Sequence, residues 1–156
     1  MADNYGKNFE QKFKKDFLNT VKNSTVDRLY DPTNGFYSIS NISDFICYSY
    51  PNIFYIENKT HKGASLPFKN IRQYDKLIKK IGIPGVRVGV VLWLYEKDAV
   101  LYIPVSTIKK MKLDGRKSVG LKAIQEGYNI KIIPSIKKKV YMDSDYSCLM
   151  NLIDGE

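Results

Sequence analysis

Charged side chains with a spacing suited to phosphodiester chemistry stand on two apolar runs between Ser43 and Lys59. Asp44 begins the first run, SDFICYSY, and Glu57 and Lys59 lie near the end of the second, NIFYIENK. Both runs are rich in Ile, Tyr and Phe, which predicts two neighbouring strands joined by a tight turn. Because side chains alternate along a strand, Glu57 and Lys59 project to one side and Asn58 to the other.

The chemistry that fits these residues is Mg²⁺-dependent hydrolysis of a phosphodiester. Carboxylate oxygens of Asp44 and Glu57, with the backbone carbonyl of Asn58, would hold a Mg²⁺ ion that keeps several waters and meets a phosphate. Mn²⁺ is expected to substitute, since it favours the same oxygen ligands. Lys59 would orient the attacking water and offset the charge that develops on phosphorus. The alternative is a salt bridge on a half-exposed sheet, which this spacing alone does not exclude.

The size and composition of the chain predict a single domain, residues 1–156, of an ordinary globular protein. It has 156 residues, of which 44% are hydrophobic and 26% charged, as in a typical globular domain. No apolar run reaches the roughly 18 residues of a membrane span. We therefore expect no membrane partner and a location in the cytoplasm of a bacterial host. With one histidine and no C-x-x-C motif, a zinc site is excluded and any metal must be held by oxygen.

Positive charge is concentrated in the second half of the chain. The formal net charge is +9, and ten basic residues lie between positions 105 and 141 against Asp114 and Glu126. These are Lys109, Lys110, Lys112, Arg116, Lys117, Lys122, Lys131, Lys137, Lys138 and Lys139. Such a concentration favours a polyanionic partner, and nucleic acid above a membrane. The alternative is that lysine is simply the common surface residue of an AT-rich coding sequence.

Hydrophobic periodicity predicts helices and strands in alternation. Phe9, Phe13 and Phe17 lie four residues apart and predict one apolar face of a helix over 4–21. Other helices are expected at 68–81, from 106 to 111, and at 144–153 with Ser144 or Asp145 as cap. The expected strands are 24–30, 86–95, 99–105, 129–134 and 137–142, and the expected loops are 31–42, a basic segment at 60–67 and a mobile basic segment at 114–120. This pattern predicts an α/β domain with a central sheet.

The first helix also carries an acidic residue, Glu10, at the edge of its apolar face. Glu10 would reach the predicted site if this helix packs beside the sheet. The alternative is a carboxylate in the first turns of a helix, where the helix dipole favours it. The segment directly after Lys59 places His61 and Lys62 beside any bound phosphate.

In sequence order, these motifs resemble those of the RecU-type Holliday junction resolvases, a branch of the restriction-endonuclease-like nucleases with the P-D…(D/E)-x-K constellation. The resemblance rests on N-x-G-x-x-x-E in NYGKNFE, on Ser43 and Asp44, on E-x-K at Glu57 and Lys59, and on Ser65, Pro67 and Asn70 in SLPFKN. It covers about residues 4–128. The small size fits a short phage-type member.

The resemblance implies a restriction-endonuclease-like core, with a central mixed β-sheet flanked by helices. It also implies a homodimer that resolves four-way DNA junctions by paired symmetric nicks in recombination and repair, and an interaction with a recombinase. Carried onto this chain, Asp44 and Glu57 are metal ligands, Lys59 is the catalytic lysine, and Glu10 completes the catalytic set. Gln73 and Asp75 are the candidates for a glutamine that the family has after E-x-K.

The residues expected to contact branched DNA come from the basic loop, the following helix and the basic second half. They are His61, Lys62, Arg72, Gln73, Lys109, Lys110, Arg116 and Lys117. The family's stalk, which fills the junction centre, is shortened here to a projection around Asn34 to Tyr37. Two other functions therefore stay open: a general or flap and duplex DNA endonuclease of the same fold, and a non-catalytic DNA-binding modulator of recombination.

Overall fold

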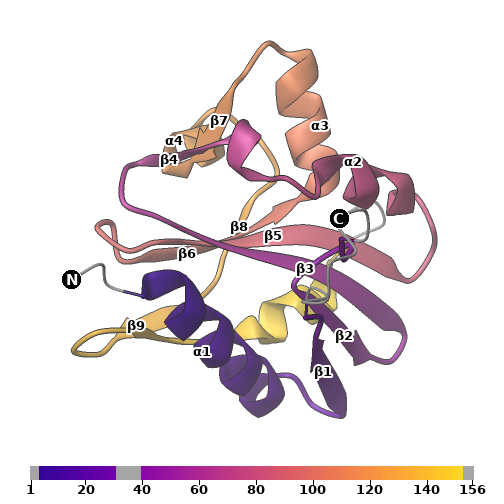
Figure 1. Ribbon diagram of the computed structural model, residues 1–156, viewed down its shortest axis with the longest axis vertical. Coiled ribbons are helices and arrows are strands. Elements are labelled where there is room, and N and C mark those ends of the chain that lie inside the picture. Colours follow the sequence, from indigo (N-terminus) through magenta and orange to yellow (C-terminus); the bar gives the residue numbers. More distant parts are fainter. Residues whose placement is uncertain (1–3, 31–39, 153–156) are drawn as a thin grey trace.

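A six-stranded mixed sheet forms the centre of the molecule (Figure 1). The structure is a computed structural model and describes residues 4–30 and 40–152. The strands are β1 (Ser24–Arg28), β2 (Phe45–Ser49), β3 (Asn52–His61), β5 (Val86–Leu94), β6 (Ala99–Pro104) and β8 (Lys131–Ile132), in the order β1-β2-β3-β5-β6-β8. Strands β3 and β5 run parallel, and the other neighbours are antiparallel. The predicted mixed sheet is therefore confirmed.

The β2–β3 hairpin fixes the position of the charged residues. Its pairing runs from Ser49 opposite Asn52 to Phe45 opposite Ile56. One step further, Asp44 precedes β2 and Glu57 continues β3, so the register brings these two residues to the same end of the hairpin. Strand β3 continues beyond β2 to His61, paired only with β5 there.

Helix α1 (Tyr5–Thr20) covers one face of the sheet (Figure 1). Its phenylalanines Phe9, Phe13 and Phe17 are buried in one apolar cluster with Ile56 of β3 and Trp93 of β5. The four-residue spacing therefore predicted the buried face correctly. This packing fixes the helix against the strand that carries Glu57.

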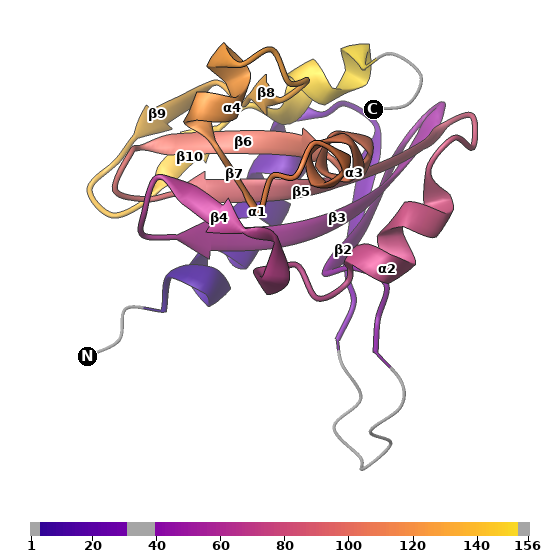
Figure 2. The same ribbon diagram turned by 90° about the horizontal axis from the view of Figure 1, so that it is seen from above.

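The opposite face is covered by α3 (Val105–Leu113), α4 (Leu121–Gln125) and a two-stranded ribbon of β4 (Ser65–Pro67) and β7 (Ser118–Gly120) (Figure 2). The prediction of a mobile loop through 114–120 was wrong for the residues of β7. A three-residue strand has too few positions for a periodic pattern. Its backbone approaches β4 closely, because a Cβ on Gly120 would lie 2.0 Å from the Ala64 carbonyl oxygen.

The predicted helix over 68–81 is divided into three short pieces. They are the 3-10 helix η1 (Phe68–Asn70), α2 (Tyr74–Leu77) and the 3-10 helix η2 (Ile78–Lys80). Ile71 leaves helical geometry, with φ −93° and ψ 79°, and its side chain is buried. Burial of Ile71 in a non-helical conformation therefore outweighs continuous helical hydrogen bonding.

The C-terminal third also departs from the predicted elements. The strand expected at 129–134 is reduced to β8, and the strand expected at 137–142 is wrong. Instead β9 (Ser135–Lys137) and β10 (Met142–Ser144) form a hairpin, in which the Lys138 amide donates to the Tyr141 carbonyl at 2.8 Å. Of the three consecutive lysines, Lys137 ends β9 opposite Met142, and Lys138 and Lys139 lie in the exposed turn. The last expected helix is the 3-10 helix η3 (Tyr146–Asn151), capped by Asp145.

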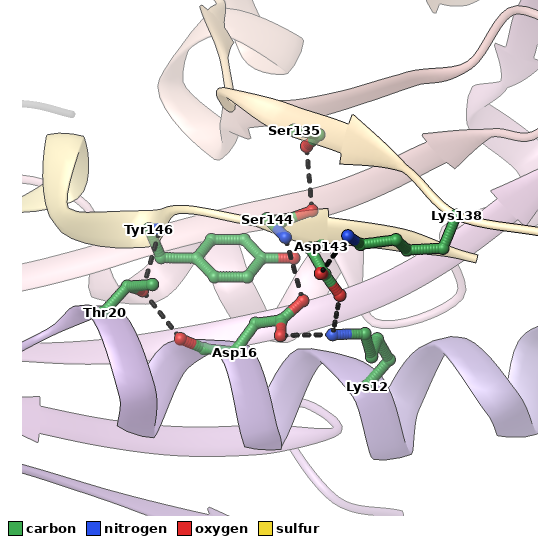
Figure 3. Close-up of polar contacts among 8 residues, drawn as sticks. All are labelled: Lys12, Asp16, Thr20, Ser135, Lys138, Asp143, Ser144 and Tyr146. Carbon is green, nitrogen blue, oxygen red and sulfur yellow. Dashed lines mark hydrogen bonds and ion pairs between the residues drawn. The ribbon is translucent and has the colours of Figure 1, made fainter.

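A buried polar network fastens this hairpin to α1 (Figure 3). Asp16 of α1 is 6% exposed, and its carboxylate accepts from the Ser144 amide at 3.0 Å and from Lys12 Nζ at 2.5 Å. Lys12 Nζ also lies 2.7 Å from Asp143, and Thr20 Oγ1 accepts from the Tyr146 amide at 3.0 Å. The hairpin therefore has a fixed position beside α1.

None of the helices within the described ranges is long and apolar enough to cross a membrane.

Candidate active site

Asp44, Glu57 and Lys59 come together at one end of the β2–β3 hairpin. The Asp44 carboxylate accepts a hydrogen bond from the Asn58 amide, with 2.8 Å between Oδ2 and N. Lys59 Nζ lies 3.6 Å from Glu57 Oε1, and the Glu57 residue is 5% exposed. The site is thus built on paired strands, which hold side chains more precisely than loops do.

The two sides of β3 have different neighbours. Glu57 and Lys59 are in register with Val90 and Leu92 of β5, which belong to the cluster under α3. Asn58 points to the face under α1, and its buried Oδ1 and Nδ2 have no hydrogen-bond partner among the described residues. Its backbone amide orients Asp44, while the prediction that its carbonyl binds metal stays a prediction.

Arg28 connects the acidic residue of α1 to this group. Its Nε lies 3.0 Å from Glu10 Oε2, its Nη2 lies 3.8 Å from Asp44 Oδ1, and its Nη1 donates to the carbonyls of Leu29 and Asp44. Glu10 therefore lies at the same end of the sheet, as the helix packing suggested. Sequence reasoning missed Arg28 as a site residue, because nothing in its local spacing indicates which carboxylates it meets.

Burial and like charge make this group electrostatically costly. Burial raises the pKa of Glu57 to about 8, the neighbouring Asp44 charge also raises it, and Lys59 lowers it. Burial and then Asp44 raise the pKa of Glu10, while Arg28 and Lys59 act in the opposite direction. The carboxyls thus repel one another, and their protein cations offset the repulsion only in part.

These residues fit a divalent cation. Glu57 Oε2 is buried and has no hydrogen-bond partner among the described residues. A cation beside Asp44 and Glu57 would give that oxygen a ligand and remove the repulsion between the two carboxylates. The described part of the chain has no cluster of three or more His, Cys, Asp or Glu side chains arranged to hold a metal. Two carboxylates with retained waters match the way Mg²⁺ is commonly held near a phosphate.

The predicted DNA contacts that follow E-x-K, called the rim residues below, lie at or just after the end of β3 and between η1 and α2. His61 ends β3, and Lys62 is exposed, with its Nζ 3.9 Å from Glu96. Arg72 and Gln73 lie between η1 and α2, and the Phe68 amide of η1 donates to the Lys117 carbonyl at 2.9 Å. This bond places the segment of Lys117 next to the segment of Arg72. The shortened projection at Asn34 to Tyr37 lies outside the described residues.

The other predicted DNA contacts are exposed on α3 and after it. Lys109 and Lys110 lie on the last turns of α3, and Lys110 Nζ lies 5.8 Å from the centre of the Tyr128 ring. Arg116 forms an ion pair with Glu126 and also stacks over Tyr128. To bind a phosphate, Arg116 would have to break its ion pair with Glu126. The roles of all these residues in DNA binding stay predictions.

The fold is a mixed sheet with helices on both faces, in which Asp44 lies just before β2 and the E-x-K motif lies on the neighbouring strand β3. Comparison with solved structures supports this fold class. The chain is similar to Hjc, a Holliday junction resolvase from the archaeal hyperthermophile Archaeoglobus fulgidus, with a TM-score of 0.58 and 16% sequence identity over 80% of this chain and 95% of that one. No protein-family model and no curated protein matches the chain. The predicted restriction-endonuclease-like fold is thereby confirmed.

Proposed function

We propose that the protein is a Mg²⁺-dependent endonuclease that cleaves four-way DNA junctions. The observation that carries this proposal is the pair of half-buried Asp44 and buried Glu57, in which one Glu57 oxygen has no hydrogen-bond partner among the described residues and Lys59 lies beside the other. A pair of this kind costs folding free energy and is explained by a cation and a phosphate. The similar fold of an archaeal Holliday junction resolvase favours a junction as the substrate.

Each residue then has a distinct task. Asp44 and Glu57 would hold the cation, which when bound supplies charge stabilisation for the phosphate and the leaving oxygen. Lys59 would place the attacking water and stabilise the charge on phosphorus. Arg28 would hold Asp44 and Glu10 in position through its three nitrogens.

A homodimer belongs to this proposal for a geometric reason. A four-way junction has two symmetric scissile phosphates, and two copies related by a two-fold axis present two sites at once. The exposed basic residues of the rim and of α3 would contact backbone phosphates. Such contacts predict junction binding that weakens steeply with salt.

The test is cleavage of a labelled synthetic four-way junction beside a linear duplex of the same sequence, each with and without Mg²⁺. We expect paired symmetric nicks in the junction only, dependent on Mg²⁺ and absent in Glu57→Gln. Asp27→Asn is the matched control, because it removes an exposed carboxylate that pairs with none of the predicted DNA contacts. Its cleavage should equal that of the unchanged protein.

The other outcomes point to the two alternative functions. Equal cutting of the linear duplex would indicate a general endonuclease of this fold. Junction binding without any cutting, with Mg²⁺ or Mn²⁺, would indicate a non-catalytic DNA-binding protein. Either result would overturn the proposed junction resolvase.

A further inference from the structure

A cavity of about 690 Å³ lies between α1 and the β9–β10 hairpin, apart from Asp44 and Glu57. We call it the α1–hairpin groove. Four lysines and one aspartate are among its lining residues, together with Tyr5, Trp93, Tyr95 and Tyr141. The groove thus combines aromatic rings with an excess of positive charge. None of its lining residues belongs to the candidate catalytic set of Glu10, Asp44, Glu57 and Lys59.

The aromatic part of the groove is a stack of rings. Tyr5 and Tyr95 are parallel, with ring centres 4.1 Å apart and planes 9° apart, and both rings meet Trp93 edge-on. The two tyrosines are half-buried. Trp93 is 6% exposed, and its buried Nε1 has no hydrogen-bond partner among the described residues. The rim therefore offers flat, partly exposed rings of the kind on which bases stack.

The charged part comes from two elements held in a fixed relation. Lys12 and Lys15 belong to α1, and Lys137 and Lys139 belong to the hairpin. Lys12 is engaged by Asp16 and Asp143 in the network that fastens the hairpin to α1 (Figure 3). Lys137 is paired with Asp98 at 3.0 Å.

Two lysines of the groove are not paired with an acidic residue of the described chain. Lys15 and Lys139 are exposed and make no ion pair or hydrogen bond with another residue that the structure describes. They lie on opposite walls, one on α1 and one on the hairpin. An anion between the walls would therefore be attracted by both.

From these observations we propose that the α1–hairpin groove binds single-stranded DNA, with a base stacked on the Tyr5–Tyr95 pair and backbone phosphates beside Lys15 and Lys139. Its volume lies in the range of small-ligand pockets, about 300–1,000 Å³, which suits a nucleotide or two rather than a duplex. Stacking on a ring requires an unpaired base.

The groove lies beside the end of β3 that follows Lys59, on the face of the sheet opposite to Glu57 and Lys59. The Tyr95 amide donates to the carbonyl of His61 at 3.3 Å, and His61 follows Lys59 by two residues on β3. The inference rests on the proposed function only in requiring DNA as the ligand, and it does not require cleavage.

The test uses the full chain and a fluorescently labelled oligothymidylate, longer than the ~4–16 nucleotides that comparable sites cover. Trp93 is the only tryptophan of the chain, so its intrinsic fluorescence reports on this groove. We expect oligothymidylate to bind at low salt and to change the Trp93 emission, and a linear duplex to compete weakly. No binding, no change in emission, or equal competition by duplex would overturn the proposal.

Variants separate the groove from general electrostatic attraction. Lys15→Gln with Lys139→Gln should reduce the dependence of log affinity on log salt by about 1.4, at about 0.7 per phosphate contact on a single strand. The matched control is Lys22→Gln with Lys79→Gln, which removes two exposed lysines outside the groove. Equal effects of the two pairs would overturn the proposal.

A third variant tests the stacking. Tyr95→Leu keeps an apolar side chain but removes the aromatic ring, and it should weaken oligothymidylate binding about tenfold or more. Cleavage at the Glu57 site is measured separately, on the four-way junction. If oligothymidylate binds as predicted but no junction is cut, the groove is supported and the proposed nuclease function fails. If junctions are cut and Tyr95→Leu binds oligothymidylate as tightly as the unchanged protein, the proposed nuclease function is supported and the proposed groove fails.

Discussion

Two carboxylates of this protein are almost equally buried but have opposite surroundings. Asp16 is 6% exposed and Glu57 is 5% exposed. Asp16 accepts hydrogen bonds from Lys12 and from the Ser144 amide, so both of its oxygens have a donor. Glu57 has Lys59 at 3.6 Å on one oxygen, nothing among the described residues on the other, and Asp44 as a neighbour of like charge. Burial alone therefore does not distinguish these two carboxylates, whereas incomplete pairing does, and incomplete pairing marks Glu57 as the candidate functional group.

The physical difference lies in what each carboxylate stabilises. The pairs of Asp16 join α1 to the C-terminal hairpin, and they offset the cost of burying the charge. At Glu57 that cost is only partly offset within the chain. We infer that Asp16 serves the fold and that Glu57 serves a ligand, and the following variants test this contrast.

The largest effect is expected for Glu57→Gln. Cleavage should fall about a thousandfold, because the site loses a preorganised charge, while junction affinity should stay unchanged. At neutral pH and without metal, the free energy of unfolding should rise by about 1 kcal/mol, because the folded protein no longer has to protonate a buried carboxyl whose pKa is raised to about 8. Cleavage assays and urea denaturation measure the two quantities. A less stable variant would show that Glu57 supports the fold, as Asp16 does.

The reverse result is expected for Asp16→Ala. This change leaves the Ser144 amide without an acceptor and removes one partner of Lys12, so the free energy of unfolding should fall by about 3 kcal/mol. Cleavage per folded molecule should be nearly unchanged. Asp75→Ala is the control, because Asp75 is exposed and its loss should cost less than about 0.5 kcal/mol. Denaturation curves equal to those of the unchanged protein would contradict the role of Asp16.

The contrast also shows what the sequence could predict. The two runs rich in Ile, Tyr and Phe predicted the hairpin that brings Asp44 and Glu57 together, and the phenylalanine spacing predicted the buried face of α1. Both are local patterns, and both are observed. The fold class followed from the same patterns, together with the order of the motifs.

Features that depend on contacts between distant segments could not be predicted. Arg28 joins Glu10 to Asp44 across three elements, and Asp16 meets Ser144 128 positions further along the chain. The β4–β7 ribbon is three residues long on each side, too short for a period. The prediction of one helix over 68–81 was wrong because Ile71 is buried in a non-helical conformation, which the local spacing of apolar residues does not indicate.

A smaller effect is expected at Arg28, which we interpret as a positioning residue. Arg28→Gln should lower cleavage about 10- to 100-fold, the scale found when a group that orients a metal ligand is lost. The Mg²⁺ concentration for half-maximal cleavage should also rise, because Asp44 is then less well oriented. Arg28→Lys keeps the charge but not the planar guanidinium and should restore only part of the activity. A loss of stability with an unchanged Mg²⁺ requirement would reduce Arg28 to a structural role.

The smallest effect is the stabilisation of the DNA-free protein by the cation itself. If Asp44 and Glu57 hold Mg²⁺, an ion concentration of ten times Kd should raise the free energy of unfolding by about 1.4 kcal/mol, because the ion binds the folded state. Asp44→Asn should lose most of this gain, whereas Asp16→Ala should keep it despite its lower baseline. Thermal denaturation with Mg²⁺, with Mn²⁺ and with chelator measures the difference. Equal stabilisation of Asp44→Asn and the unchanged protein would place the cation elsewhere, and the unpaired oxygen of Glu57 would then need another explanation.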